Sequence, residues 1–261
     1  GVAADVLPGG VPTTYRGKYK LPLESPMVSV VIPTREGASH LQKCLDSISA
    51  RTTYPNYEIV IVDNGSIEKK TLDFLRTLNQ EPKVSVLRFP GEFNYSAINN
   101  AGAEVAQGSI ICLLNDDTEV ITDGWLGEMV GQLLQPEIGV VGAKLLYPDQ
   151  TIQHAGVITG IGGFVGHGHK HASHSDHGYF ARLTVAHEVG AVTGACLLTT
   201  RKLWDQVGGL DQENFKVAFN DVDYCLRVRQ SGYKVVWTPH AELLHHESKP
   251  RGLDLSPEKK E

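Results

Sequence analysis

Two adjacent carboxylates follow a fully apolar segment of the chain. Residues 113–120 read LLNDDTEV, so Asp116 and Asp117 come after the run IICLL, with only Asn115 between. Carboxylates at the end of a buried strand are costly without a counter-cation. Mg²⁺ or Mn²⁺ takes one or two carboxylates and completes its shell with phosphate oxygens, so this pair predicts a metal site for a diphosphate. A solvated turn or helix cap is the alternative, because Asp and Asn are common in turns.

A further carboxylate lies at a predicted helix start. Residues 219–227 read FNDVDYCLR, which puts Asp221 at the start of a helix with Val222, Cys225 and Leu226 toward the core. Such a carboxylate either caps the helix or serves as a general base that deprotonates a hydroxyl nucleophile.

Two neighbouring histidines follow another apolar run. His245 and His246 lie in the segment LLHHES. Imidazole in this position binds a metal or contacts phosphate, and the alternative is a purely structural histidine.

Alternating strands and helices are predicted to position these groups. Short apolar runs predict strands at residues 28–32, 58–62, 84–88 and 110–114, with helices at 41–50, 69–78 and 96–106 between them. This order implies an α/β fold with a mostly parallel sheet covered on both faces. Ligands of such sheets bind beyond the carboxyl ends of the strands, where residues 33–36, 63–66 and 115–117 lie.

The rhythm changes in the second half of the chain. We predict helices at residues 125–134, 201–207 and 221–231, and strands at 140–146, 234–237 and 242–245. The glycine-rich residues 152–168 give no clear pattern.

Composition excludes several classes of protein. The 261 residues carry a formal charge of −6, which argues against nucleic acid as the main partner. There is no apolar run of the roughly 18–20 residues needed to span a bilayer. The four cysteines form no CxxC pair and predict reduced core thiols. The first strand is followed by PTREG, without the GxGxxG of a dehydrogenase or the glycine-rich basic loop of a nucleotidyltransferase.

Several motifs together are more specific than any one of them. VVIPTR, IVDNGS, LNDD, VTGA, NDVDYCLR and LHHES occur in this order, and the set resembles the family 2 glycosyltransferases. FNYSAINNAG, GAKLLYPDQTIQHAG and VAFNDVDYCLR are similar to domains of bacterial O-antigen and rhamnan-type polysaccharide synthesis. The resemblance runs from about Val28 to Gly252 and implies the GT-A fold. That fold has a Rossmann-like, mostly parallel central sheet flanked by helices, with a smaller mixed sheet on the acceptor side.

The resemblance implies a site for a nucleotide-sugar donor. In it Asp63 reads the pyrimidine ring. Asn99 and Asn100 lie where relatives carry Arg-Asn. Asn115 replaces the first acid of the DxD motif, which leaves Asp116 as a ribose or sugar contact. The donor-binding residues so implied are Pro33, Thr34, Arg35, Glu36, Asp63, Asn64, Asn100, Asn115 and Asp116.

The resemblance also implies the catalytic, metal and acceptor residues. Asp221 matches the general base, Asp117 the metal-binding acid and His245 a later metal-binding histidine, with His246 as its competitor. The acceptor-side residues so implied are Thr193, Gly194, Ala195 and Asn220. We therefore expect an inverting single displacement that depends on Mn²⁺ or Mg²⁺.

Residues 167–177 contain five histidines: His167, His169, His171, His174 and His177. Glycine, serine and lysine between them predict a mobile polar loop. In the family that the chain resembles this region lies near the acceptor opening, so we expect a flexible lid over the substrate. A plain surface loop and a zinc or nickel site are the alternatives.

We expect four segments and a set of partners. Residues 1–27 form an irregular lead-in, 28–125 the nucleotide-sugar-binding half, 126–252 the acceptor-binding and catalytic half, and 253–261 a charged tail. The expected partners are a UDP- or dTDP-sugar and a glycan or lipid-linked glycan. We expect a domain of a larger multidomain glycosyltransferase in the cytoplasm, brought to the inner face of the membrane by other domains. The alternative, motivated by Asn115, is a catalytically silent module that binds glycan.

Overall fold

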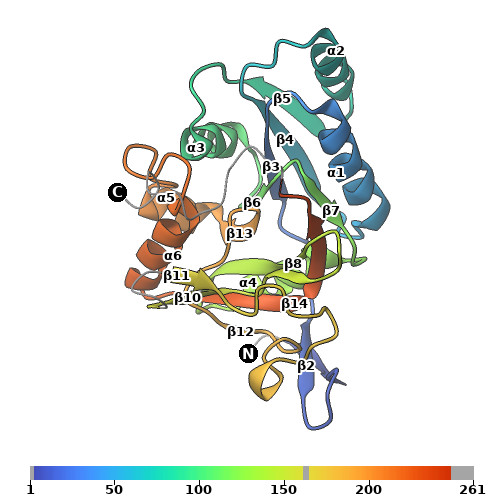
Figure 1. Ribbon diagram of the computed structural model, residues 1–261, viewed down its shortest axis with the longest axis vertical. Helices are drawn as coiled ribbons and strands as arrows, with labels where there is room; N and C mark the ends of the chain where they lie inside the picture. Colours follow the sequence, from blue (N-terminus) through green and yellow to red (C-terminus); the bar gives the residue numbers. More distant parts are fainter. Residues whose placement is uncertain (1–2, 161–164, 248–261) are drawn as a thin grey trace.

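One large sheet runs through the molecule (Figure 1). The computed structural model describes residues 3–160 and 165–247. The strand order is β12-β14-β8-β13-β6-β3-β4-β5, with β7 paired to β14 and β9 to β8. The first half has four parallel strands, which are β3 (Val28–Thr34), β4 (Tyr57–Asp63), β5 (Val84–Arg88) and β6 (Ile110–Leu114). Three helices connect them along the chain: α1 (Ala38–Arg51), α2 (Lys69–Leu78) and α3 (Tyr95–Val105). The sequence predicts these elements to within three residues at each end.

The second half extends the same sheet in a mixed order. Strand β13 runs antiparallel to both β6 and β8, and β14 runs parallel to β8. The elements after β6 are β7 (Thr118–Val120), α4 (Trp125–Leu133), β8 (Ile138–Leu146), β9 (Ile152–His154), β10 (Val157–Thr159), β11 (Val165–His167), the 3₁₀ turn η2 (Tyr179–Ala181), β12 (His187–Glu188), β13 (Cys196–Thr200), α5 (Arg201–Val207), α6 (Asn220–Gln230) and β14 (Lys234–His245). The two predicted halves therefore share one continuous sheet.

Helices cover both faces because the central strands are apolar on both sides. Along β6, Ile110, Cys112 and Leu114 join a core cluster with residues of α1 and α4, whereas Ile111 and Leu113 join one with residues of α3, α5 and α6. In Figure 1, α1 lies to the right of β3 and β4, and α3 lies to their left. This is the two-sided burial that a run such as IICLL predicts.

Helix α3 packs closely on the first two strands. A Cβ at Gly102 would lie 2.4 Å from Val31 Cγ1 and 2.8 Å from Val62 Cγ2. Only glycine allows this approach, which brings the start of α3 to the carboxyl ends of β3 and β6.

Two predictions about the ends of the chain need correction. The lead-in is not irregular throughout, because β1 (Ala4–Pro8) and β2 (Tyr15–Tyr19) pair antiparallel. Arg16 of β2 lies 2.8 Å from Glu128 of α4, so this hairpin is attached to the fold. The strands predicted at 234–237 and 242–245 are one strand, whose pairing with β8 shifts register between Trp237 and Glu242. Pro239 lies in this interval and has no N–H to donate, which interrupts the ladder although the chain stays extended.

The remaining expectations divide into confirmed and untested. All four cysteines are buried and free, as predicted. In the described part of the chain, no helix combines the length and apolarity that crossing a bilayer needs. The predicted tail at residues 253–261 lies outside the described residues.

Candidate active site

The loop after β6 holds the predicted carboxylates at the carboxyl end of the parallel strands. Thr34, the last residue of β3, donates its hydroxyl to Asp116 Oδ2 at 2.6 Å. Asp117 is buried, with 7% of its surface exposed. The backbone turns back at once, since Thr118 N–H donates to Asn115 O. The apolar strand and this tight turn hold both acids in fixed positions.

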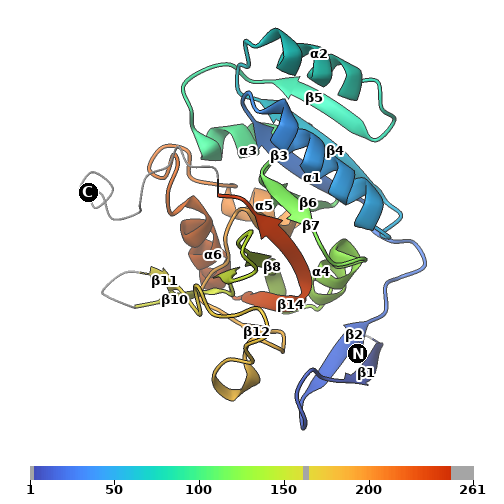
Figure 2. The same cartoon turned by 45° about the vertical axis from the view of Figure 1, so that its right-hand side comes forward.

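The end of β14 brings a histidine to this loop. Figure 2 shows β14 curving past β8 so that its end lies beside β7. The antiparallel register with β7 pairs His245 with Thr118, next to Asp117. His245 Nε2 lies 3.1 Å from Asp117 Oδ1. By contrast, His246 Nε2 lies 2.7 Å from Glu119 Oε1.

The donor atoms of Asp117 and His245 fit a divalent metal. Two ligands at about 2.1 Å from an octahedral ion, at a right angle, lie about 3.0 Å apart. The observed separation of 3.1 Å between Asp117 Oδ1 and His245 Nε2 is close to that value. No group of three or more His, Cys, Asp or Glu side chains in the described residues could hold a metal. The pair therefore suits an ion whose other ligands come from water or from a diphosphate.

Asp221 lies at the start of α6, as predicted. Its Oδ2 accepts the N–H of Gly194, and its Oδ1 accepts the N–H of Val222, both at 2.8 Å. The residue that caps the helix, Phe219, has a left-handed backbone with φ of 61°. This conformation costs a bulky residue about 1–3 kcal/mol and is found mostly at functional sites. Asp223 N–H stabilises the turn by donating to Phe219 O.

A series of hydrogen bonds joins Asp117 and His245, here called the metal pair, to Asp221. Tyr95 Oη lies 3.0 Å from both Asn115 Oδ1 and Gly194 O. Asn115 Nδ2 in turn lies 3.2 Å from His245 Nε2. Gly194 carries the N–H bound by Asp221. The sequence analysis missed Tyr95, although its position one turn before Asn99 on a helix that faces the sheet could have indicated it.

The other predicted acceptor-side residues surround Gly194. Thr193 N–H donates to His154 Nε2 at 3.4 Å, and Ala195 O accepts the N–H of Asn115. Asn220 is buried and donates its amide to Val217 O. The loop is thus held by both halves of the sheet.

The predicted nucleoside end centres on Asp63 at the end of β4. Its Oδ1 accepts the N–H of Ser66 at 2.8 Å, and its Oδ2 pairs with Arg88 Nη1 at 2.5 Å. Ser66 Oγ accepts the N–H of Glu36, whose carboxylate accepts the N–H of Ile67. Sequence reasoning missed Arg88. Arg88 meets Asp63 because the parallel register of β4 and β5 pairs these two residues at the ends of the strands.

The remaining donor-side predictions have different surroundings. Asn64 donates its amide to Phe89 O, and Pro33 and the exposed Arg35 flank Thr34. Asn100 points away from these residues, because its amide both donates to Leu210 O and accepts Leu210 N–H.

Several histidines of the 167–177 segment are tied to the fold. His167 Nδ1 lies 3.0 Å from Nδ1 of the buried His154, and His171 stacks on Tyr147 with ring centroids 5.2 Å apart. His174 Nε2 lies 2.8 Å from Glu242 Oε1. Burial, then the nearby His167 and His245, lowers the pKa of His154 well below 6.5. These contacts attach the segment to the fold at three points, and its role as a mobile lid stays a prediction.

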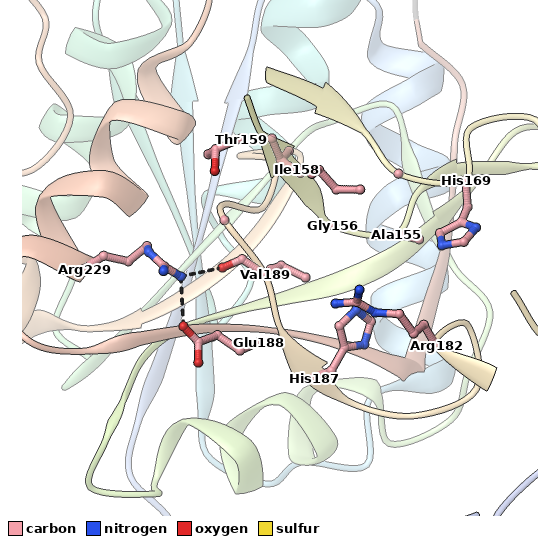
Figure 3. A pocket seen from close by; sticks show the side chains of 13 residues that line it. Ala155, Gly156, Ile158, Thr159, His169, Arg182, His187, Glu188, Val189 and Arg229 are labelled. Carbon is pink, nitrogen blue, oxygen red and sulfur yellow. Dashed lines mark hydrogen bonds and ion pairs between the residues drawn. The ribbon is translucent and has the colours of Figure 1, made fainter. Parts of the chain in front are cut away.

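A separate pocket of about 430 Å³ opens beside this segment (Figure 3). Arg182, His169 and His187 lie on one side of it, and Arg229 pairs with Glu188 on the other. Neither the metal pair nor Asp221 lines it. Its lining residues Ala155 and Gly156 directly follow His154, which accepts the N–H of Thr193. The pocket therefore adjoins the loop that contains Thr193.

Comparison with known proteins gives a consistent picture. The family model described as Glycosyl transferase family 2 matches residues 29–203. The chain is 47% identical over 262 residues to the uncharacterized protein y4gI of Sinorhizobium fredii, covering 100% of this chain and 29% of that protein. It is 37% identical over 248 residues to the O-antigen biosynthesis protein RfbC of Myxococcus xanthus, covering 95% and 19%. The chain thus spans less than a third of either protein.

More distant proteins share the architecture. The chain is 26% identical to the N-acetylglucosaminyl-diphospho-decaprenol L-rhamnosyltransferase of Mycobacterium tuberculosis, covering 87% of this chain and 78% of that protein. The mannosyltransferase PcManGT of Pyrobaculum calidifontis, solved with GDP-Man and Mn²⁺, matches with TM-score 0.64, 19% identity and coverage of 89% and 60%. GalNAc-T7, solved with UDP, GalNAc and Mn²⁺, matches with TM-score 0.71, 18% identity and coverage of 87% and 45%. The fold is GT-A, as the sequence predicts.

Proposed function

Since the chain belongs to glycosyl transferase family 2, we propose that it moves a sugar from a UDP- or dTDP-sugar to a hydroxyl of a growing cell-surface polysaccharide. The reaction inverts the anomeric carbon. One observation carries the proposal: the metal-compatible pair Asp117–His245 and the carboxylate of Asp221 are joined by hydrogen bonds through Tyr95. One hydrogen-bonded network thus holds a group for the leaving diphosphate and a base for the nucleophile.

The donor lies along the carboxyl ends of β3, β4 and β6. Asp63 reads the pyrimidine edge that uridine and thymidine share, and Arg88 holds its carboxylate in place. Asp116, oriented by Thr34, contacts the ribose or the sugar. Asp117 and His245 would hold Mn²⁺ or Mg²⁺, and a metal there would neutralise charge on the departing diphosphate. We assign this role to His245 and not to His246, whose Nε2 lies 2.7 Å from Glu119 Oε1 on the neighbouring strand.

Asp221 acts on the acceptor. Its two hydrogen bonds to backbone N–H groups fix the direction of its carboxylate. From there it takes the proton of the acceptor hydroxyl as that oxygen attacks the anomeric carbon from the face opposite the diphosphate. General-base help of this kind is typically worth about 10²–10⁴-fold in rate.

The relatives guide the choice of substrate and setting. One is described as an O-antigen biosynthesis protein and another as a rhamnosyltransferase acting on a decaprenol-linked sugar. We therefore infer a glycan or lipid-linked glycan acceptor. Because the chain matches less than a third of its two most similar relatives described above, we infer a domain of a larger, cytoplasmic enzyme that works at the inner face of the membrane.

A thermal-shift titration tests the proposal. UDP, dTDP and GDP are each added with and without Mn²⁺. A ligand at about 100 times its dissociation constant adds about 2.7 kcal/mol of stability and raises the melting temperature. We expect UDP or dTDP to stabilise the protein only with Mn²⁺, and His245→Gln to abolish this effect whereas His246→Gln keeps it. If no nucleotide shifts the melt under any condition, a silent glycan-binding module, suggested by Asn115, replaces the proposal.

A further inference from the structure

A buried glutamine contacts the ring nitrogen of His245 that faces away from Asp117. Gln153 lies on β9, only 7% exposed. Its Oε1 is 2.6 Å from His245 Nδ1. The sequence analysis gave Gln153 no role, and residues 152–168 showed no pattern that would place it beside β14.

The surroundings fix the orientation of the Gln153 amide. Its Nε2 lies 3.4 Å from His245 O and 3.4 Å from Glu247 Oε2. A carbonyl and an ionised carboxylate only accept hydrogen bonds, so the NH₂ group faces them and Oε1 faces the ring. Because Oε1 is also only an acceptor, the ring must carry its proton on Nδ1.

The proton on Nδ1 determines what the other side of the ring offers. In neutral imidazole one nitrogen carries the proton and the other a lone pair. The lone pair is then on Nε2, which lies 3.1 Å from Asp117 Oδ1 and 3.2 Å from Asn115 Nδ2. The Asn115 amide can donate to that lone pair, whereas an acid at this position would add another acceptor.

We propose that Gln153 is the positioning residue that keeps His245 in the Nδ1–H tautomer, so that Nε2 is free to bind the divalent ion beside Asp117. This inference rests on the proposed function. It also gives Asn115 a role, because its amide donates a hydrogen bond to the lone pair on His245 Nε2 until the metal ion binds there. Partners of this kind orient metal-binding histidines, and their loss typically weakens metal affinity about 10–100-fold.

The test uses Gln153→Met, which removes the amide at similar length. Its matched control is Gln132→Met, at a glutamine of α4 with 6% exposure that lines a different pocket, beside Tyr19 and His240. Mn²⁺ binding is followed by the electron paramagnetic resonance signal of free Mn²⁺, with and without UDP. We expect the dissociation constant to rise about 10–100-fold in Gln153→Met and to stay within about twofold in Gln132→Met.

A second measurement reads the tautomer without any metal. Nitrogen-15 NMR of the histidine rings at pH 8 should show His245 protonated on Nδ1 in the unsubstituted protein, and the preference should be lost in Gln153→Met. An Nε2–H tautomer in the unsubstituted protein, or unchanged Mn²⁺ affinity in Gln153→Met, would overturn the inference. If the unsubstituted protein binds no Mn²⁺ even with UDP, the proposed function fails. The NMR result still decides the role of Gln153 in that case, and also if Gln153→Met does not fold.

Discussion

Replacing Asp221 by asparagine removes the proposed base and also disturbs a hydrogen-bonded turn. The two carboxylate oxygens accept one backbone N–H each, from Gly194 and from Val222. Asparagine has a single acceptor oxygen, so one of these N–H groups must face the side-chain NH₂. Asp221→Asn is therefore not a silent isostere in this fold, and two separate costs are expected.

The two costs fall on different measurable quantities. Loss of the base should lower kcat about 10²–10⁴-fold, which corresponds to about 2.7–5.5 kcal/mol in the activation barrier. A backbone N–H left without an acceptor should lower the free energy of unfolding by about 1–3 kcal/mol. Donor affinity should change less than about threefold, because the hydrogen bonds of Asp221 go to Gly194 and Val222 and not to Asp117 or Asp63.

The assay measures release of nucleoside diphosphate at saturating donor and acceptor, together with urea unfolding and nucleotide titration. The matched control is Asp223→Asn, two residues along the same helix. Asp223 pairs with Arg227 at 2.6 Å, and both side chains are more than 20% exposed. Pairs of this exposure contribute about 0–1 kcal/mol, so this variant should keep kcat within about threefold.

Two results would contradict the proposed role of Asp221 as the base. If Asp221→Asn keeps more than a tenth of the kcat of the unsubstituted protein, the proton leaves through another group. If instead kcat and donor affinity fall together and the loss of stability exceeds about 5 kcal/mol, the carboxylate is mainly structural.

Two further predictions concern the loop that holds Asp221. Burial lowers the pKa of His154, so only the unfolded state gains its proton as pH falls below about 6.5. Stability should therefore fall by about 1.3 kcal/mol more between pH 7.5 and 5.5 than in His154→Gln, and parallel urea-unfolding profiles would refute this. A Cβ at Gly142 would lie 2.4 Å from Val192 Cβ. Gly142→Ala should cost about 1–3 kcal/mol in unfolding and lower kcat, and an unchanged melting temperature would contradict the packing argument.

Sequence reasoning predicted the first half of the fold well because its strands are apolar on both faces. The runs VSVVI and IICLL have no reading other than a buried strand or a buried helix segment, and the turns after them decide for strands. The prediction was less accurate where a local feature of the sequence conflicts with the pairing of strands. Pro239 indicates a break, yet β14 continues past it because β8 and β7 hold the chain on both sides of the shift.

The residues of the candidate site also differ in whether the sequence alone predicts them. The positions of Asp116, Asp117 and Asp221 could be predicted because each lies next to an element that the sequence itself marks, the strand β6 or the helix α6. Arg88 and Gln153 could not, because each is defined by a pairing between distant segments. Arg88 meets Asp63 through parallel register, and Gln153 meets His245 across 92 positions of sequence.

Tyr95 connects the two predicted halves of the chain. Its hydroxyl lies 3.0 Å from Asn115 Oδ1, which belongs to the donor half, and 3.0 Å from Gly194 O, which belongs to the acceptor half. A hydroxyl has one proton, so it can donate to only one of these two oxygens at a time. If a diphosphate and metal bind beside Asn115 as proposed, any shift of Asn115 would therefore change what Gly194 O receives. Because Gly194 also carries the N–H bound by Asp221, donor binding under the proposed function would have a direct physical route to the proposed base.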